Sequence, residues 1–333
     1  MAWIDAHAHL PADHSDAHEL LDSLGVQVLN ISLGLDAAGA WRDEPMSGEQ
    51  PYQRLAAAGP RRFAWCTAFD PPTLADLQRP FAFTERTIAR LARDFADGAV
   101  ACKVWKNVGM EVRDHEGRFV MVDSPIFTPI FEYMAREDRA LLLHTGEPRA
   151  CWLPLDPVSP HYEYYRQHPQ WHMYGRSDYP SHAELIASRD RVVERHPKLR
   201  VVGAHLGSLE YDVGELESRL RRFKNFSVDT AERLLDLTLQ PRARVRDFFE
   251  AFADRILYGS DLLFERAFSA MTETERAAAL TEMRERLERE RAYYETEAVL
   301  TLRGRQVQGL ALSPGTAQQL FEHNARNCYQ LPE

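Results

Sequence analysis

Two histidines stand one residue apart near the start of the chain, in the segment WIDAHAHL at residues 3–10. Side chains of a β-strand alternate between its two faces, so His7 and His9 would project to the same side, about 7 Å apart along the strand. Two neutral imidazoles placed in this way can bind one metal ion. Because His-x-His also occurs by chance in ordinary strands, the pair indicates a metal site only if other residues join it.

Other polar residues lie at or near the ends of further predicted strands. They are Lys103 in AVACKVW, His144 in ALLLHT, His205 in RVVGAHL and Asp261 in ILYGSD. A single histidine at a strand end is more often a hydrogen-bonded core residue than a ligand, but four histidines and an aspartate together predict a divalent metal site. Nitrogen and oxygen ligands without sulfur favour zinc, with manganese as the alternative, and one or two ions stay open.

The elements that would position these residues are eight short β-rich segments that alternate with stretches of helical composition. Strands are predicted at residues 3–8, 26–33, 62–69, 99–105, 140–145, 200–206, 226–230 and 256–261, and helices at 73–98, 125–138 and 181–197 among others. This alternation predicts a parallel sheet, and eight units favour a closed (β/α)8 TIM barrel of the α/β class, with catalytic groups at the carboxyl ends of its strands. An open doubly wound sheet is the alternative, but no G-x-G-x-x-G follows the first strand.

Lys103 needs a separate explanation, because an ammonium group is repelled by a metal ion. Alternation places Cys102 and Val104 on the helix-covered face of their strand. Lys103 then points into the barrel, where an unpaired ammonium is costly. It would pair with Asp261 or a substrate carboxylate, or it would react with carbon dioxide to give a carbamate that bridges two metal ions. We expect the pairing.

The predicted single domain at residues 1–333 carries three insertions in its βα loops. Residues 145–182 hold seven Trp or Tyr residues and exceed an ordinary βα connection, which indicates a lid or a binding wall. Simple packing of these aromatics on the barrel rim is the alternative. Residues 111–122 predict two short strands around a Glu116-Gly117 turn, and residues 263–300 predict a charged, solvated helix.

Four residues near the predicted metal site are candidates for binding an anionic or aromatic substrate. They are Trp105, Lys106, Glu147 and Arg149. Lys106 is either at the barrel mouth or an ordinary surface lysine. A surface salt bridge explains Arg149 equally well, with Glu147 as its partner. The histidines of the lid are expected to be structural.

Composition limits the classes of partner. A formal net charge of −10 argues against a general surface for nucleic acid or anionic lipid. The chain begins directly with the first strand, and no apolar run approaches the about 20 residues of a membrane span, so a cytoplasmic protein is expected. The four scattered cysteines favour reduced thiols. We expect a small-molecule substrate, and a homo-oligomer stays open.

The segments DAHAHL, CKVWK, LLLHTGEP, VVGAHLGS and LYGSD together resemble the amidohydrolase superfamily of metal-dependent hydrolases. The chain is most similar to the amidohydrolase-related branch that includes aminocarboxymuconate semialdehyde decarboxylase, including a terminal helix at GTAQQLFEHNARNCYQL. This resemblance implies that His7, His9, His144 and Asp261 bind one metal ion. It also implies that His205 polarises the substrate or binds a second metal, and that a carbamylated Lys103 would mark a two-metal site. The segment HTGEPRACWLPLDPV departs from the better-known decarboxylases, so their substrate contacts are not transferred.

The predicted site supports a hydrolase of a C–N or C–O acyl bond in an amide, lactone or ester. Asp261 would orient a metal-activated water and take its proton, while the metal and His205 would stabilise the oxyanion. The alternative is a non-oxidative decarboxylase of an aromatic or dienoic acid on the same site. A non-catalytic metal-bound binding protein is a third hypothesis.

Overall fold

A closed ring of parallel strands forms the centre of the protein. The structure is a computed structural model, and it describes residues 3–9, 15–31, 33–35, 41–43, 63–263 and 271–332. The strands, in hydrogen-bonded order, are β10 (Ile256–Leu257), β9 (Phe226–Asp229), β8 (Val201–Gly203), β7 (Ala140–Leu143), β6 (Ala99–Val104), β5 (Phe63–Ala68), β2 (Val26–Ile31), β1 (Trp3–His9) and β11 (Leu262–Leu263). The predicted (β/α)8 barrel is confirmed.

The ring closes through a divided last strand. β10 pairs with β9 on one side, and β11, five residues later in the chain, pairs with β1. Ala6 N donates to Tyr258 O at 2.9 Å, which joins the end of β10 to β1 as well. The two pieces therefore act as one eighth strand, interrupted at the carboxyl end of the barrel by Ser260 and Asp261.

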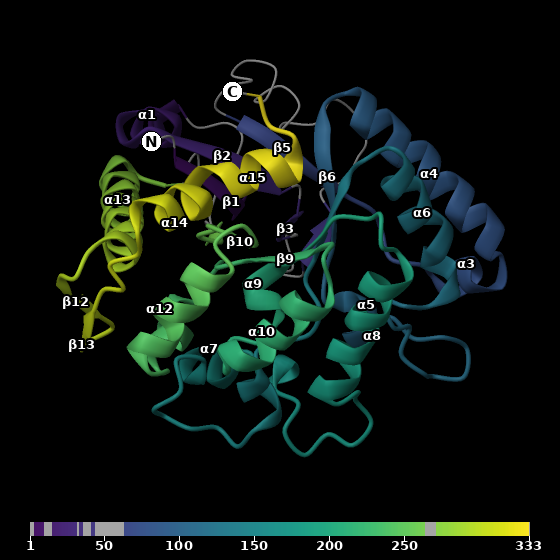
Figure 1. The fold of residues 1–333 in the computed structure, drawn as a ribbon. Coiled ribbons are helices and arrows are strands. Elements are labelled where there is room, and N and C mark those ends of the chain that lie inside the picture. The colour runs from purple at the N-terminus through teal and green to yellow at the C-terminus, as the bar shows by residue number, and fades with distance from the viewer. Residues whose placement is uncertain are drawn as a thin grey trace.

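Helices cover the outside of the barrel (Figure 1). They include α1 (Ser15–Leu24), α3 (Leu74–Gln78), α4 (Pro80–Ala96), α6 (Thr128–Arg136), α8 (His182–Arg195), α10 (Val213–Arg222), α11 (Leu234–Thr238) and α12 (Arg242–Ala251). The predicted helix 73–98 is divided because Pro80 begins α4 and cannot supply the N–H that would continue α3. Capping boxes at Thr73 and Ser181 fix the starts of α3 and α8.

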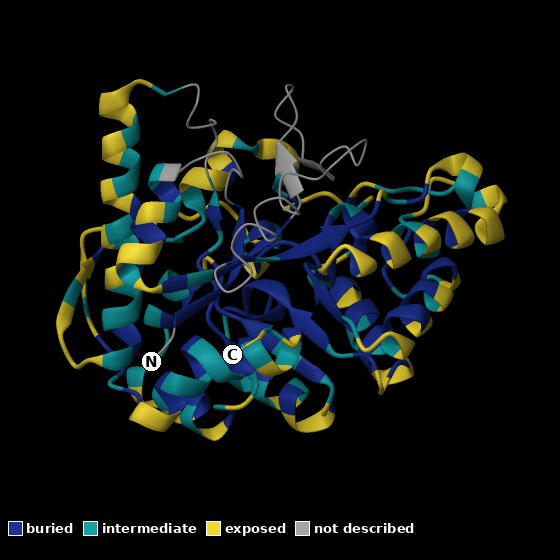
Figure 2. Ribbon diagram, turned by 90° about the horizontal axis from the view of Figure 1, so that it is seen from above, coloured by how far each residue is buried: buried dark blue, intermediate teal, exposed yellow. Residues whose placement is uncertain are grey.

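Buried side chains form two layers, one inside the barrel and one between the strands and the helices. Ala101 and Leu142 belong to the inner cluster, whereas Cys102 and Val104 belong to the outer one. The side chains of β6 therefore alternate between the two faces as predicted. Lys103 points into the barrel and is 2% exposed. Seen from above, the strands are buried and the outer faces of the helices are exposed (Figure 2).

The insertions differ in part from the prediction. Residues 145–182 contain η2 (Arg149–Trp152), α7 (Tyr162–Gln167) and η3 (Pro169–Trp171), so the lid is partly helical. The short α5 (Asn107–Met110) follows β6, but the two strands predicted at 111–122 are wrong: only a single bridge, Arg113 to Phe119, forms around the turn. Backbone hydrogen bonds from Asp114 N to Arg118 O and from Val120 N to Val112 O flank the bridge, so the segment is a short turn held by a few bonds and not a pair of strands.

The last third of the chain adds a long helix, a hairpin and the terminal helices. The predicted charged helix is α13 (Glu273–Glu295), while residues 264–270 of that prediction lie outside the described part. A hairpin of β12 (Val299–Leu302) and β13 (Arg305–Gln308) follows. The terminal segment then consists of α14 (Pro314–Gln318), η5 (Gln319–His323) and α15 (Asn324–Tyr329). A smaller hairpin joins β3 (Leu33–Leu35) to β4 (Trp41–Asp43), so the strand predicted at 26–33 ends early, at Ile31.

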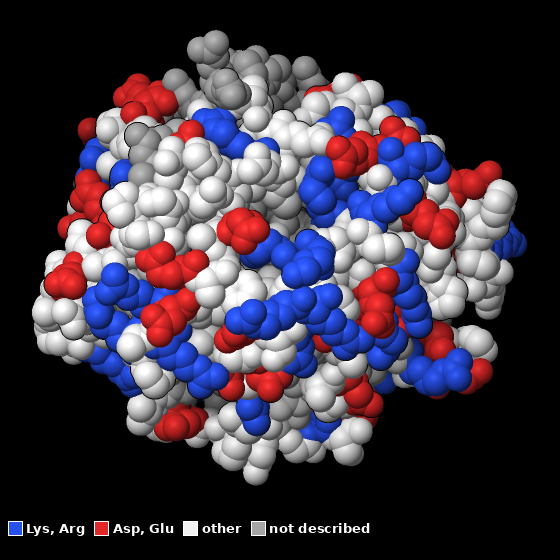
Figure 3. Space-filling model, in the orientation of Figure 1, with Lys and Arg blue, Asp and Glu red and all other residues white. Residues whose placement is uncertain are grey.

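The charged side chains on one face and the cysteines can be described from the structure. Acidic and basic side chains are intermixed on the face that carries α8, α10 and α12 (Figure 3). Ion pairs such as Arg221–Glu217 and Arg222–Glu194 account for part of this mixture. All four cysteines are free thiols. Among the described residues, no helix has both the length and the apolar character to cross a membrane.

Candidate metal centre

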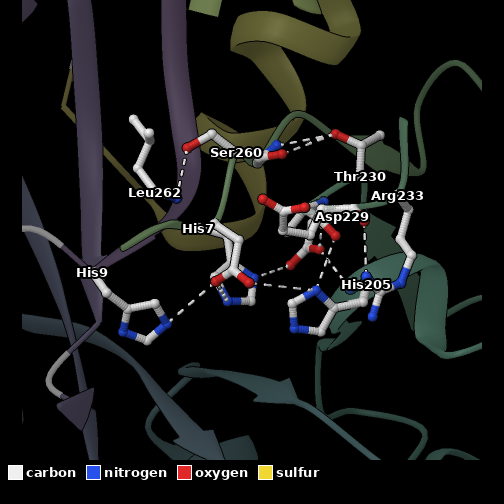
Figure 4. A network of polar contacts seen from close by, with 12 residues as sticks. His7, His9, His205, Asp229, Thr230, Arg233, Ser260 and Leu262 are labelled. Atoms are coloured by element: carbon white, nitrogen blue, oxygen red, sulfur yellow. Dashed lines mark hydrogen bonds and ion pairs between the residues drawn. The ribbon is translucent and has the colours of Figure 1, made fainter. Parts of the chain in front are cut away.

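His7, at the carboxyl end of β1, is held by side chains from β9 and β6. Its Nδ1 lies 2.7 Å from Asp229 Oδ2, and Lys103 Nζ lies 2.8 Å from its Nε2. An ionised carboxylate only accepts hydrogen bonds, so Asp229 places the ring proton on Nδ1 and leaves the lone pair on Nε2. His7 therefore presents an unprotonated nitrogen to the centre of the site (Figure 4).

Asp261 lies in the gap between β10 and β11 and faces the same nitrogen. Its Oδ1 is 3.3 Å from His7 Nε2 and 3.5 Å from His9 Nε2. Its backbone N donates to His7 O at 2.7 Å, and its φ of 57° is in the left-handed region that side chains with a β-carbon rarely adopt. Burial alone would raise the pKa of Asp261, but its interactions with the neighbouring side chains of His7, His9 and Lys103 outweigh burial and lower this pKa. The carboxylate is thus ionised at neutral pH.

His205 is aimed by a left-handed turn at the end of β8. The backbone has positive φ at each residue from 205 to 208, within and just after the short α9 (Ala204–Gly207). The backbone N of His205 donates to Asp229 Oδ1 at 2.7 Å, and its Nδ1 donates to Ala231 O at 2.9 Å. Since a carbonyl oxygen only accepts, the lone pair of the neutral ring is on Nε2. One carboxylate, Asp229, therefore orients two of the predicted ligands.

His144 completes this group of imidazoles. Its ring centroid is 4.3 Å from that of His205, and its buried Nε2 has no hydrogen-bond partner among the described residues. Burial, together with nearby positive charges such as Lys103, holds the pKa of both His144 and His205 well below the ordinary value. Both rings are neutral at physiological pH and can act as ligands. A buried imidazole nitrogen without a partner is costly unless a metal or another group binds it.

The predicted ligands are therefore neighbours in space. Ligand atoms of His7, His205 and Asp261 all lie within 4.8 Å of one another. His9 is in contact range of Asp261, and His144 stacks edge-on against His205. Neutral imidazoles, one ionised carboxylate and an unpartnered nitrogen are a donor set that fits a divalent metal ion.

Lys103 lies at the edge of this group. It contacts His7 rather than the expected Asp261: no ion pair shorter than 4 Å joins Lys103 to any described carboxylate. Burial lowers its pKa, and the negative charges of Asp261 and Asp229 oppose this only in part. Lys103 Nζ donates to His7 Nε2 in this arrangement, and the carbamate stays the alternative to pairing.

Two buried aspartates that support the site were missed by the sequence analysis. Asp229 ends the strand FSVDT, so the same rule of polar residues at strand ends could have found it. Asp5 accepts hydrogen bonds from the backbone N of His7 at 3.1 Å and of Ser260 at 3.0 Å, and also from the Ser260 hydroxyl. It thereby ties β1 to the turn that carries Asp261, a role that no local pattern indicates.

The predicted substrate residues are not gathered around one point. Trp105 and Lys103 line a cavity of about 340 Å³ together with residues of the loops after β5 and β6. This volume is near the lower end of the usual range for small-molecule sites. Arg149 lies apart from it, with its guanidinium 4.5 Å from the Tyr211 ring centroid. Glu147 pairs with Lys106, not with Arg149.

Lys106 is buried rather than a surface lysine. Besides the ion pair with Glu147, its Nζ lies 4.3 Å from the Trp171 ring centroid and 5.3 Å from that of Trp105. Burial would lower the pKa of Lys106, but Glu147 and Tyr164 raise it. Lys106 thus links the aromatic insertion at residues 145–182 to the end of β6, and Trp171 of this insertion packs against Trp105, as the alternative of simple packing predicts.

This barrel, with a constellation of imidazoles and a carboxylate at the carboxyl ends of its strands, defines a TIM-barrel enzyme of the metal-dependent type. The family model for amidohydrolases matches residues 4–331, and the chain belongs to this family. No curated protein matches the chain.

Several solved structures share the fold. An uncharacterized TIM-barrel protein from Bordetella bronchiseptica is 14% identical, with a TM-score of 0.55 and 99% of each chain covered. 2,6-Dihydroxybenzoate decarboxylase from Rhizobium is 19% identical, with a TM-score of 0.54 and 99% of each chain covered. A probable 2-pyrone-4,6-dicarboxylic acid hydrolase from Acinetobacter baumannii is 11% identical, with a TM-score of 0.52, covering 99% of this chain and 100% of that one. At these identities the likeness concerns the fold.

Proposed function

We propose that the protein is a metal-dependent hydrolase that cleaves a C–N or C–O acyl bond, in an amide, lactone or ester of a small molecule. The observation that carries this proposal is the convergence of His7, His205 and Asp261 within 4.8 Å, with Asp229 holding the lone pairs in place. The adjoining cavity of about 340 Å³ has room for a small substrate.

The ligands we assign to a divalent ion, zinc or manganese, are His7, His9, His144, His205 and Asp261. Such an ion would supply a water of lowered pKa and would polarise the acyl oxygen. We propose one ion with an unmodified Lys103. Two ions per chain, with a carbamate on Lys103, is the alternative, and metal analysis of protein purified without chelators decides between them.

Asp261 is the residue that we assign to proton transfer. It is ionised at neutral pH, and its side chain is 23% exposed, so water can reach it. It accepts a proton from the attacking water and returns it to the leaving group. The polarising role considered for His205 is weaker, because its only N–H is committed to Ala231 O and its other nitrogen cannot donate to an oxyanion. A ligand role suits it better.

Substitution of Asp261 by Asn tests the proposal. We expect kcat to fall about 100- to 10,000-fold with the fold intact by circular dichroism, since general acid–base catalysis contributes this much. The exposed Asp254, changed to Asn, is the matched control and should leave kcat unaltered. Full turnover by Asp261→Asn would reject the assignment.

A decarboxylase of an aromatic or dienoic acid is the second candidate for the same site. It is supported by the full-length likeness to 2,6-dihydroxybenzoate decarboxylase. The two candidates differ in their products, because only decarboxylation releases carbon dioxide and exchanges solvent deuterium into the ring or chain. Product analysis by mass spectrometry in deuterated water separates them.

A further inference from the structure

Arg233, four residues after the end of β9, is a buried cation that neither the metal ligands nor the proton transfer uses. Its side chain lies beside His205 (Figure 4), and the residue is 7% exposed. Nη1 donates to Glu232 O at 2.8 Å. Nε is buried and has no hydrogen-bond partner among the described residues. Nη2 forms no hydrogen bond with the described residues, but unlike Nε it is not a buried atom. One whole edge of the guanidinium is therefore free.

Nearby carboxylates do not occupy this edge. Glu210 Oε1 accepts from the backbone N of Arg149 at 2.8 Å, and Asp236 Oδ1 is 2.9 Å from His161 Nε2. The second oxygen of each, Glu210 Oε2 and Asp236 Oδ2, is buried without a hydrogen-bond partner among the described residues. Neither approaches the guanidinium of Arg233 within ion-pair distance in the described part of the chain. Their charge still offsets the burial of Arg233 and keeps its pKa raised, so the side chain remains a cation.

The free edge points to a particular kind of ligand. Nε–H and one Nη2–H are two parallel donors, a spacing that matches the two oxygens of a carboxylate. A neutral amide or hydroxyl offers a single oxygen and therefore engages only one of these two donors, whereas a carboxylate engages both and also matches the charge. The side chain of Arg233 lies beside His205, which we assign to the metal ion, so a carboxylate bound at this edge would lie near the metal centre (Figure 4).

We propose that the Nε–Nη2 edge of Arg233 binds a carboxylate of the substrate beside the metal centre, so that the enzyme acts on small carboxylic acids. This substrate class rests on the proposed function, whereas the binding of the carboxylate does not require turnover. Arg233 is then a specificity-determining residue. The sequence analysis missed it, because it follows its strand by four residues, beyond the strand end itself.

Calorimetry on the metal-loaded protein tests the proposal with three matched pairs: acetate and acetamide, benzoate and benzamide, succinate and succinamide. We expect at least one carboxylate to bind more tightly than its amide. Arg233→Met should lower the affinity for that carboxylate about 10- to 100-fold and leave the affinity for the amide unchanged, as expected for the loss of a charge-assisted bidentate contact. Arg233→Lys keeps the charge but lacks the two parallel N–H donors of the guanidinium, so it should retain only part of the affinity. Arg86→Met, at an exposed arginine of α4, is the control and should bind as the wild type does.

Metal content separates failure of this proposal from failure of the proposed function. Arg233→Met should retain the wild-type metal stoichiometry, and if it does not fold, Arg233→Lys carries the test alone. Equal binding of every carboxylate and its amide by the wild type would overturn the inference. Unaltered carboxylate affinity in the folded variant would overturn it too, because the metal would then be the sole anion site. Arg233-dependent binding in a protein without hydrolytic turnover would sustain this inference and reject the proposed reaction.

Discussion

Asp229→Asn is the substitution that best tests how the metal centre is organised. Asp229 Oδ2 holds the Nδ1 proton of His7 at 2.7 Å, while Oδ1 accepts from the backbone N of His205 at 2.7 Å and of Ala231 at 3.2 Å. An asparagine can replace only one of these oxygens. In one orientation its NH2 group faces the backbone N–H groups of His205 and Ala231, so that donors face donors. In the other orientation the NH2 group faces His7 Nδ1. In the latter case it forces the ring proton onto Nε2, the nitrogen that must bind metal.

Either orientation should weaken metal binding without removing a ligand. Loss of such an orienting partner typically costs 10- to 100-fold in metal affinity, which corresponds to about 1.4 to 2.7 kcal/mol. Calorimetric titration of chelator-treated protein with zinc and with manganese measures this effect. Asp94→Asn is the matched control. Asp94 is also a buried carboxylate, and it accepts a hydrogen bond from Thr67 Oγ1 at 2.5 Å, but it does not belong to the metal centre. Wild-type affinity for both metals in Asp229→Asn would show that the tautomer argument is wrong.

Two further predictions concern stability. Glu147→Gln leaves the buried Lys106 ammonium without its counter-ion and should lower the free energy of unfolding by about 3 to 5 kcal/mol in urea titrations, whereas a loss below 1 kcal/mol would mean that the pair is solvated. His182, whose Nε2 donates to Ser208 O, has its pKa lowered by burial to about 4. The unfolded chain therefore takes up a proton below about pH 6.5 that the folded chain takes up only near pH 4, so stability falls as pH drops through this window, by up to about 3 kcal/mol. The difference in unfolding free energy between wild type and His182→Gln should shift by that amount between pH 7 and pH 4.5; a constant difference would contradict the assignment.

The strands and the cluster of candidate metal ligands were predictable because both follow from local rules. Buried parallel strands appear as short apolar runs, and polar residues at their carboxyl ends must meet at one end of a barrel. His7, His144, His205 and Asp261 all satisfy this rule, and the parity of β6 correctly directed Lys103 inward. These inferences need only the alternation of side chains and the topology.

The contacts between segments distant in sequence were not predictable in this way. Lys106 was left between the surface and the barrel mouth, because its burial depends on Glu147 and on the ring of Trp171 from the lid. Arg149 was expected near the substrate, but the course of the lid turns its side chain onto Tyr211. The left-handed turn at residues 205–208 was also missed, since only Gly207 in it has a residue type that favours positive φ. Its other residues adopt that conformation because tertiary contacts hold them there.

The divided eighth strand has a consequence for how the protein acquires its ion. Asp5 and Ser260 are bonded across 255 positions of the chain, and His7 meets Asp261 through the same closure. During synthesis the amino-terminal histidines thus emerge long before the acidic ligand exists. If these residues bind an ion as we propose, a ribosome-bound chain can offer only an incomplete set of donors. Tight binding of the ion would then wait until the last strand has docked, and metal loading would report that the barrel has closed.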